Sequence, residues 1–239
     1  MSGRVGSITT DIIADGLILN IDPANRASTI PSTSTDKTFN TVDTSISGAF
    51  SDNGIFDSST ISPSYAFGGT DDRIESSNFT QLNSTSDFSV SVWVKAASGA
   101  QADNYAYIIS TGPSDGSKLQ IGISQNDTSN QLNFMIRNSS DTSYTTLAGV
   151  ENFFNGNWRN IVITYDGATM SFYTDSGTLL TTSHTGVLPI QSNMVLSIGA
   201  SPTQNYFNGN IGPVQIYNRA LSANEVLHNY NALKGRFGL

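Results

Sequence analysis

The chain of 239 residues contains no cysteine and only two histidines, His184 and His228. Without cysteine no disulfide can stabilise the fold, and a structural zinc site, which needs several cysteine and histidine ligands, is excluded. The histidines are isolated from each other and from any recognisable catalytic motif, so we interpret both as surface residues. We therefore expect no metal and no cofactor.

Charge is also scarce, since Asp, Glu, Lys and Arg make up only 13% of the residues. Nineteen acidic residues outnumber eleven basic ones, the net charge is −8, and the basic residues form no cluster. A nucleic-acid-binding protein needs a lysine- and arginine-rich stripe, so this class of partner is excluded. No segment approaches the length of a membrane-spanning helix, and the first residues lack a signal-peptide core, which predicts a soluble protein without membrane insertion.

Paired carboxylates are missing as well. The three glutamates are Glu75, Glu151 and Glu225, and none has a second carboxylate at the spacing that glycoside hydrolases use for their acid and nucleophile. Asp71 and Asp72 are adjacent, so on a strand they would point to opposite faces, and we favour a turn with a partner in Arg73 over a metal site. We predict that the protein is not an enzyme and has no catalytic residue.

Serine, threonine and asparagine, by contrast, number 34, 25 and 23, about a third of the chain. Asparagine and serine favour turns and threonine favours strands, so this composition is typical of an all-β fold. Alternating apolar residues support that prediction. Leu17, Leu19 and Ile21 should share one face of a strand, and residues 88–96 alternate throughout, with Trp93 on the polar face.

Turns and one helix punctuate these strands. Asp166 and Gly167 predict a hairpin turn, and the residues from Asp175 to Gly177 predict the next one. We interpret the stretch from Asn25 to Ser64 as long surface excursions with one or two short strands, around Phe39 and between Phe50 and Phe56.

Near the end of the chain, Ser222 and Glu225 fit a capping box that begins a short amphipathic helix. Gly235 stands where a helix-terminating glycine is expected. The apolar stripe predicted to face the core consists of Val226, Leu227, Tyr230 and Leu233.

Several motifs occur in a familiar order: YAFGGTDDRIE, FSVSVWVKA, WRNIVITYDGATMSFYTDSG and YFNGNIGPVQIYNRALSANEV. In this order they resemble the laminin-G-like, concanavalin-A-like lectin family. The resemblance implies a two-sheet antiparallel jelly-roll sandwich with one short C-terminal helix and with the first and last strands as neighbours. It divides the chain into an N-terminal arm (1–14), the jelly-roll domain (15–233) and a C-terminal tail (234–239).

Two departures from the family pattern bear on metal binding. The family's histidine after the second tryptophan is Asn160 here, and the acidic pair near the last strand is replaced by Gly212 and Pro213. Family members that bind calcium use acidic and amide oxygens at loop ends, so a calcium site is in doubt. The closing residues NYNALKGRFGL resemble the C-terminal ends of structural proteins from marine, particularly cyanobacterial, tailed phages.

Two sets of candidate site residues follow. Lectins of this fold use loop aromatics and amides to bind sugars, so among the aromatics Trp93, Tyr105, Tyr107, Tyr144 and Tyr206 we select Tyr105 and Tyr206 with Asn205, because polar turn residues flank them. We predict that Trp93 and Trp158 serve packing. At the chain ends, we predict a protein interface of Ile12, Ile13, Arg236, Phe237 and Leu239, because no further element follows to bury them. A tail folded back on its own sheet is the open alternative.

These observations favour a phage virion structural protein, such as a capsid decoration, cement or fibre component. Such a protein would be located in the virion, would form a homo-oligomer and would contact other capsid or tail proteins, and it could also adhere to host-surface glycan. The alternative is a carbohydrate-binding, lectin-like module that recognises host polysaccharide.

Overall fold

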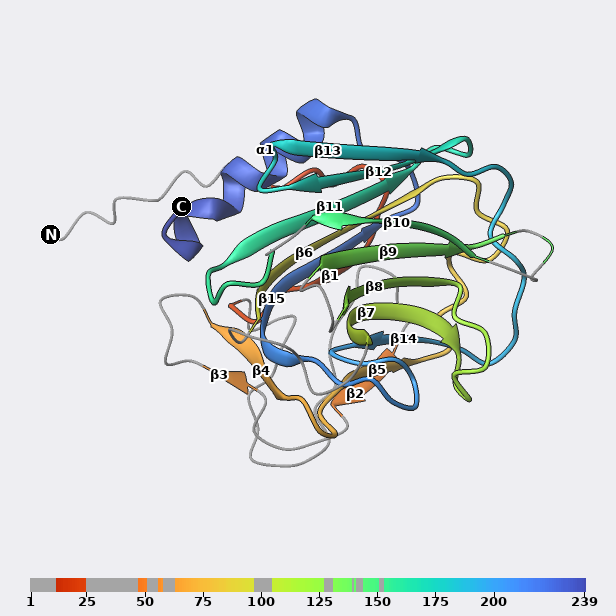
Figure 1. Ribbon diagram of the computed structural model, residues 1–239, viewed down its shortest axis with the longest axis horizontal. Helices are drawn as coiled ribbons and strands as arrows, with labels where there is room; N and C mark the ends of the chain where they lie inside the picture. Colours follow the sequence, from red (N-terminus) through yellow and green to blue (C-terminus); the bar gives the residue numbers. More distant parts are fainter. Residues whose placement is uncertain are drawn as a thin grey trace, which may run out of the picture.

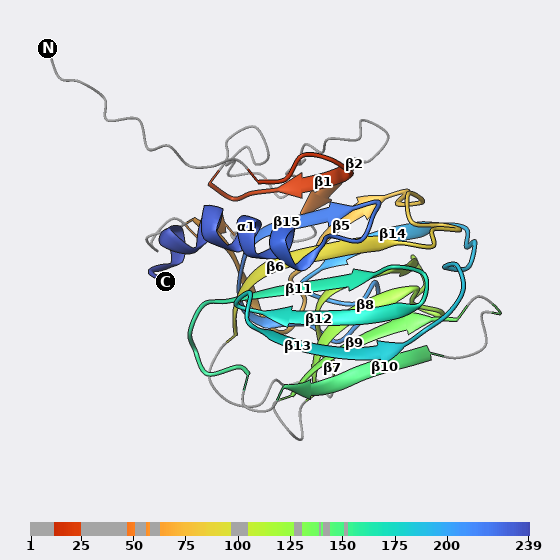
Figure 2. The same ribbon diagram turned by 90° about the horizontal axis from the view of Figure 1, so that it is seen from above.

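The computed structural model describes residues 12–24, 47–50, 56–57, 63–96, 105–126, 131–138, 140, 144–150 and 153–239. Within these residues, strands β1 to β15 form two antiparallel sheets that face each other, and one α-helix follows near the C-terminus (Figures 1 and 2). The predicted two-sheet antiparallel sandwich with a short C-terminal helix is confirmed. No helix in the described part of the chain is long and apolar enough to cross a membrane.

The first sheet carries eight of the described strands, and β6 and β15 lie near its middle. In spatial order its strands are β13 (Thr178–Ser183), β12 (Thr169–Thr174), β11 (Arg159–Tyr165), β6 (Phe88–Ala96), β15 (Asn208–Tyr217), β4 (Ser64–Gly68) and β3 (Phe56–Asp57). Strand β1 (Leu17–Ile21) also pairs with β15.

The second sheet carries seven described strands. In spatial order they are β10 (Tyr144–Val150), β9 (Gln131–Arg137), β8 (Ile121–Asn126), β7 (Tyr105–Pro113), β14 (Met194–Ile198), β5 (Ile74–Ser77) and β2 (Ser47–Phe50). Strands β2 and β3 lie within the segment in which short strands were predicted, at the two ends of the stretch between Phe50 and Phe56. The strand predicted around Phe39 lies outside the described residues.

Strand alternation builds the core between the sheets. On β6, Val90, Val92 and Val94 are buried in the main apolar cluster, and Trp93 lies on the opposite face, as the sequence pattern predicts. On β9, Leu132, Phe134 and Ile136 enter the same cluster. The residues between them, Asn133 and Met135, therefore point to the outer face of the second sheet.

The first and last strands are neighbours, as predicted. Leu19 stands directly opposite Ile216, and both are completely buried. A bulge between Leu17 and Leu19 shifts the register, so Leu17 packs in a second cluster with Tyr217 and Val226. The expectation that Leu17 shares the face of Leu19 and Ile21 is wrong, because a bulge interrupts the two-residue period on which it depended.

Both predicted hairpin turns are present. A carboxylate oxygen of Asp166 accepts hydrogen bonds from the amides of Ala168 and Thr169, at 3.0 and 2.8 Å. Gly167 adopts a φ of +89°, a conformation that glycine tolerates without strain. In the following turn, Asp175 and Ser176 have φ angles of +48° and +61°.

Helix α1 (Ala223–Leu233) begins with the predicted capping box: the Ser222 side chain accepts from the Glu225 amide, and the Glu225 carboxylate accepts from the Ser222 amide. Its inner face differs from the predicted stripe. Leu227 is 45% exposed, whereas Asn229 is buried. Asn229 takes the inner position because its amide donates to the Tyr217 hydroxyl and its oxygen accepts from the backbone of Ile13.

The chain beyond α1 continues as a 3-10 helix, η1 (Lys234–Phe237), and ends its turn at Gly238, which has a φ of +76°. Helix α1 thus ends two residues before Gly235, with Lys234 as its C-cap, close to the predicted position, but the glycine that adopts the left-handed conformation is Gly238. Two glycines, Gly235 and Gly238, could end the helical segment by local sequence. The second one does so, after the turn that carries Phe237 onto Trp93.

Phe237 folds back onto the outer face of the first sheet. Its ring centroid lies 4.2 Å from that of Trp93 and 4.7 Å from that of Trp158, and 9% of its surface is exposed. The expectation that no element is left to bury Phe237 is wrong, because the two tryptophans and Gly212 form a shallow cradle for the ring. Packing roles for Trp93 and Trp158 agree with their prediction.

The other predicted interface residues also have contacts within the chain. Arg236 makes two hydrogen bonds to the Asp22 carboxylate, at 2.7 and 2.8 Å, and the backbone of Ile13 is held by Asn229 and Tyr217. Ile12 is half-buried and Leu239 is 51% exposed. The described chain ends thus pack on one sheet, and contact of these residues with another chain stays a prediction.

Candidate functional site

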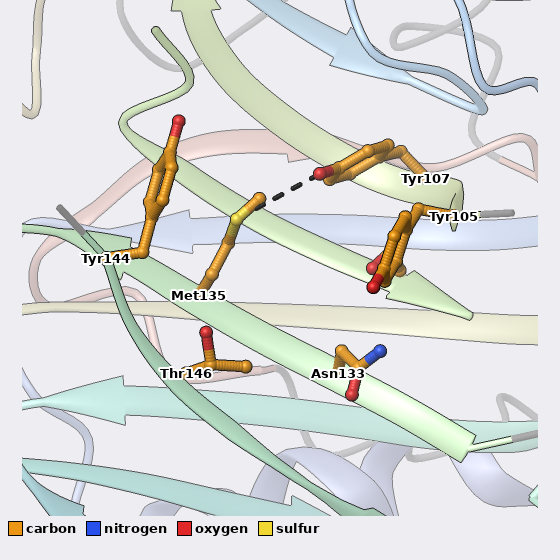
Figure 3. Close-up of a pocket in the computed structure, with 7 residues that line it drawn as sticks. Tyr105, Tyr107, Asn133, Met135, Tyr144 and Thr146 are labelled. Carbon is orange, nitrogen blue, oxygen red and sulfur yellow. Dashed lines mark hydrogen bonds between the residues drawn. The ribbon is translucent and has the colours of Figure 1, made fainter. Parts of the chain in front are cut away.

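A pocket of about 430 Å³ lies on the outer face of the second sheet, over strands β7 to β10 (Figure 3). Its volume falls in the range of small-ligand sites. The lining residues are Tyr105, Tyr107, Ser124, Asn133, Met135, Tyr144 and Thr146.

Strand register brings these residues together from four strands that are separate in sequence. Tyr107 stands opposite Ser124, and Ser124 stands opposite Asn133, so the three form one row across the sheet. Met135 and Thr146 are opposite each other in the next row of the same face. Directly opposed residues in antiparallel strands share a face, which explains why all these side chains point outward.

Tyr107 forms part of the pocket floor, and its ring lies over Gly122. A Cβ atom on Gly122 would come within 2.7 Å of the ring carbon Cε1, so only glycine leaves this space. The Tyr107 hydroxyl donates to the Met135 sulfur at 3.9 Å, and its backbone amide donates to the Asn205 carbonyl at 3.0 Å. Burial, with smaller contributions from Tyr144 and Tyr105, raises the pKa of Tyr107 above that of free tyrosine, so the hydroxyl stays neutral.

Tyr105 and Tyr144 are the exposed aromatic residues of the pocket, at 48% and 40%. Figure 3 shows Met135 between Tyr144 and Tyr107, with Tyr105 beside Tyr107. The Arg137 guanidinium lies 4.2 Å from the Tyr144 ring centroid and covers one ring face. The same guanidinium donates a hydrogen bond to the Tyr144 hydroxyl, so Arg137 holds the ring in place while Tyr144 stays partly exposed.

Three polar side chains of the pocket lack partners among the residues that the structure describes. The side chains of Ser124, Asn133 and Thr146 make no hydrogen bond to any residue that the structure describes. Ser124 and Asn133 are nevertheless only 3% and 8% exposed. Polar groups so deeply placed normally have a hydrogen-bond partner, so Ser124 and Asn133 are suited to bind the hydroxyls of a ligand or ordered water. Thr146 is exposed and adds a hydroxyl at the rim of the pocket.

The structure separates the residues predicted to bind carbohydrate. Tyr105 lines the pocket. Asn205, which has a φ of +62°, does not line it, but its carbonyl accepts a hydrogen bond from the backbone amide of the lining residue Tyr107. The Tyr206 hydroxyl instead accepts a hydrogen bond from Arg73 at 3.5 Å and does not line the pocket. Sequence reasoning missed Ser124, Asn133, Met135 and Thr146; the alternation of residues 131–137 marks Asn133 and Met135 as outward, but not their neighbours.

Acidic residues are sparse among the described strands of this sheet. Among the residues of the seven strands, Glu75 is the single carboxylate, and it lies 3.1 Å from the Arg73 guanidinium. The Asp71 carboxylate accepts from Thr70, and that of Asp72 accepts from the Gly68 amide. Within the described part of the chain, no group of three potential metal-binding side chains is assembled.

Two other sequence features are structural in this fold. The expectation of no recognisable catalytic motif is wrong as to pattern, because residues 112–116 match the Gly-x-Ser-x-Gly pattern of serine hydrolases. They span the end of β7 and the turn after it, without the strand-to-helix geometry of a nucleophile elbow. His184 is 4% exposed, and its Nδ1 lies 2.8 Å from the Thr145 hydroxyl, so its prediction as a surface residue is wrong. Burial lowers the pKa of His184.

The sandwich and its outward pocket define a β-jelly-roll module. A sequence model described as the concanavalin A-like lectin/glucanases superfamily matches residues 67–227. Because this match covers more than half of the chain, the protein belongs to that superfamily. No curated protein matches the sequence as a relative.

Solved structures agree with the fold. The botulinum neurotoxin serotype D binding domain is 16% identical, with a TM-score of 0.63, over 90% of this chain and 50% of the other. Domain 4 of AbnA, a GH43 extracellular arabinanase from Geobacillus stearothermophilus in complex with arabinotriose, is 17% identical, with a TM-score of 0.61, over 90% of this chain and 98% of the other. The chain thus spans about half of the neurotoxin binding domain and nearly all of the arabinanase domain. At these identities the likeness shows the fold alone.

Proposed function

We propose that this protein is a carbohydrate-binding module and that the pocket over β7 to β10 holds its ligand. The observation that carries the proposal is the combination of two exposed tyrosines with three unpartnered polar side chains in one pocket. Sugar rings present apolar C–H faces and peripheral hydroxyls. The Tyr105 and Tyr144 rings suit the former, and Ser124, Asn133 and Thr146 suit the latter.

The comparisons support this proposal at the level of the fold. The superfamily is named after lectins and glucanases, and the arabinanase domain, which this chain covers almost completely, was solved with arabinotriose. A binding role is favoured over hydrolysis because two-carboxylate glycoside hydrolysis requires a second acid near Glu75, and the seven strands supply none.

Binding to immobilised and soluble polysaccharides tests the proposal. A panel of β-1,3-glucan, galactan, arabinan and their sulfated or uronate-bearing counterparts would be presented to the full chain, with affinities measured by calorimetry. The Tyr105→Ala and Tyr144→Ala variants should each lose about tenfold in affinity, corresponding to ~1.4 kcal/mol per stacked ring. Leu227→Ala is the matched control, because Leu227 is equally exposed but lies on α1 over the other sheet.

Failure of every polysaccharide to bind would contradict the proposal. Binding that survives both tyrosine substitutions unchanged would contradict the assignment to this pocket. A Tyr206→Ala variant separates the pocket from the loop site suggested by sequence, and we expect it to bind as the unmodified chain does.

A location in the virion is a second proposal, supported by the resemblance of the last residues to phage structural proteins and by the exposed Leu239. The module would then contact capsid or tail proteins, or further copies of itself, while the pocket faces outward. Quantitative mass spectrometry of purified particles of a phage encoding the chain tests this. Absence from the particles would contradict it without affecting the glycan-binding proposal.

A further inference from the structure

We infer that the pocket selects neutral glycans and discriminates against sulfated or uronate-bearing ones. This inference rests on the proposed function and specifies its ligand class. Its basis is the charge of the pocket lining. The lining residues that the structure describes are three tyrosines, Ser124, Asn133, Met135 and Thr146, and none of these seven carries a formal charge.

Among the described residues, Arg137 is the cation that contacts the lining residue Tyr144, and it is not available to an anionic sugar. Arg137 is 5% exposed, its Nε donates to the Leu119 carbonyl at 2.9 Å, and its guanidinium is stacked against the Tyr144 ring. The guanidinium therefore positions Tyr144 and does not present a free fork to the pocket. A sulfate or carboxylate needs such a donor, since bidentate arginine contacts are what make these anions bind strongly.

Desolvation adds to this discrimination. An anionic group that enters the pocket loses part of its water shell and finds only hydroxyls, an amide and a thioether in place of a cation. A neutral hydroxyl loses less hydration and gains hydrogen bonds from Ser124, Asn133 or Thr146. The net charge of −8 further repels polyanions at low ionic strength.

The layout of the pocket suits a linear segment that runs across the strands. Four adjacent strands at ~4.8 Å spacing place Tyr107 on β7 and Thr146 on β10 about 14 Å apart across the sheet. Tyr105 and Tyr144 come from the two outer strands of this set and lie at diagonal ends of the pocket. The row of Ser124 and Asn133 and the row of Met135 and Thr146 lie between them. A short neutral oligosaccharide fits this order of contacts.

The experiment compares matched probes: laminarin with sulfated laminarin, and agaro-oligosaccharides with carrageenan oligosaccharides. We expect the chain to bind one neutral member at least tenfold more tightly than its sulfated counterpart. Affinity for the neutral probe should change less than about twofold between ~20 and ~500 mM salt, because screening acts on charge pairs alone.

A charge-reversal pair at an exposed pocket position sharpens the test. Thr146→Lys and Thr146→Glu should weaken binding of the neutral probe by similar factors, since both remove the same hydroxyl. If the sulfated probe binds better, and the lysine variant strengthens while the glutamate variant weakens its binding, selection for neutral glycans is overturned. In that case, loss of sulfated-probe binding in the Tyr105→Ala variant would still uphold the proposed function, because it would place a glycan in this pocket. If no probe binds at all, the proposed function itself is overturned.

Discussion

At the scale of single residues, the pocket depends on a glycine and a tyrosine that local sequence does not connect. Gly122 lies on β8, Tyr107 on β7, and the ring occupies the space that a side chain at Gly122 would fill. The Asn205 carbonyl accepts from the Tyr107 backbone amide, and the Met135 sulfur accepts from the hydroxyl at the far end of the ring. This arrangement presents a fixed floor, so little side-chain entropy is lost when a ligand binds.

Gly122→Ala should therefore displace the Tyr107 ring and weaken glycan binding. Because the added Cβ would stand 2.7 Å from a ring carbon, we expect a stability loss of about 1–2 kcal/mol from overpacking. Thermal unfolding and calorimetry measure the two effects. Gly235→Ala is the control, because a Cβ there meets nothing within 4 Å; if both variants behave alike, the ring contact does not organise the pocket.

His184 gives the fold a pH dependence. Its ring is buried beside Tyr165, at 5.1 Å between centroids, and burial lowers its pKa from the usual 6.5. The unfolded chain therefore binds a proton at His184 at a higher pH than the folded chain does. The stability that neutral His184 contributes is complete above about pH 6.5 and declines as the pH falls below that value toward the folded pKa.

Thermal unfolding between pH 7.5 and pH 5 checks this expectation. The unmodified protein should lose stability on acidification, and His184→Gln should lose less of its own stability over the same interval. An equal pH dependence in both proteins would mean that other groups cause the change. His228→Gln is the matched control, since it leaves the buried ring in place.

At the scale of elements, sequence predicts what depends on neighbours along the chain. The alternation on β6, the turn at Asp166 and the capping box at Ser222 all require only short-range patterns, and all are confirmed. The bulge after Leu17 and the inward place of Asn229 depend on partners about two hundred residues away, Ile216 and Ile13. Such contacts leave no local signal.

The candidate site follows the same division. Tyr105 could be selected because polar turn residues flank it, and Tyr107 and Tyr144 were among the aromatics considered. Asn133 and Met135 could be assigned to the outer face of a strand, but their place beside the tyrosines requires the order β7, β8, β9 and β10 in the sheet. Sequence alone does not provide that order.

The tail illustrates an element whose stability can be tested directly. Phe237→Ala removes a ring stacked on Trp93, so we expect a loss of about 3 kcal/mol, typical of truncating a buried aromatic residue. Deleting residues 234–239 should lower the midpoint of thermal unfolding by a similar or larger amount, because the ion pair of Arg236 with Asp22 is lost as well. Leu239→Ala, at a half-exposed position, is the control.

Retention of full stability by the truncated chain would contradict the packing role of the tail. It would favour the alternative that these residues serve chiefly to dock on another chain. If the truncated chain loses stability, a second result tests docking. Assembly of the Leu239→Ala variant into particles or oligomers would contradict docking through Leu239.

At the scale of the whole molecule, the two sheets have different outer faces. Helix α1 and the tail pack on the first sheet, where Trp93 stacks with Tyr230 and Phe237, and the described chain ends meet there (Figure 2). The second sheet carries the pocket with its exposed tyrosines. A module held through its ends would therefore present the pocket on the opposite side, a geometry suited to adhesion.

The most direct test of this account is the affinity of the unmodified chain and the Tyr105→Ala/Tyr144→Ala double variant for a neutral oligosaccharide, measured by titration calorimetry beside Leu227→Ala. We predict measurable binding by the unmodified chain and by Leu227→Ala. The double variant should lose binding by at least about a hundredfold, the sum of two ring contacts at ~1.4 kcal/mol each. Equal affinities for all three proteins, each folded by thermal unfolding, would contradict the central claim that the pocket over β7 to β10 binds carbohydrate.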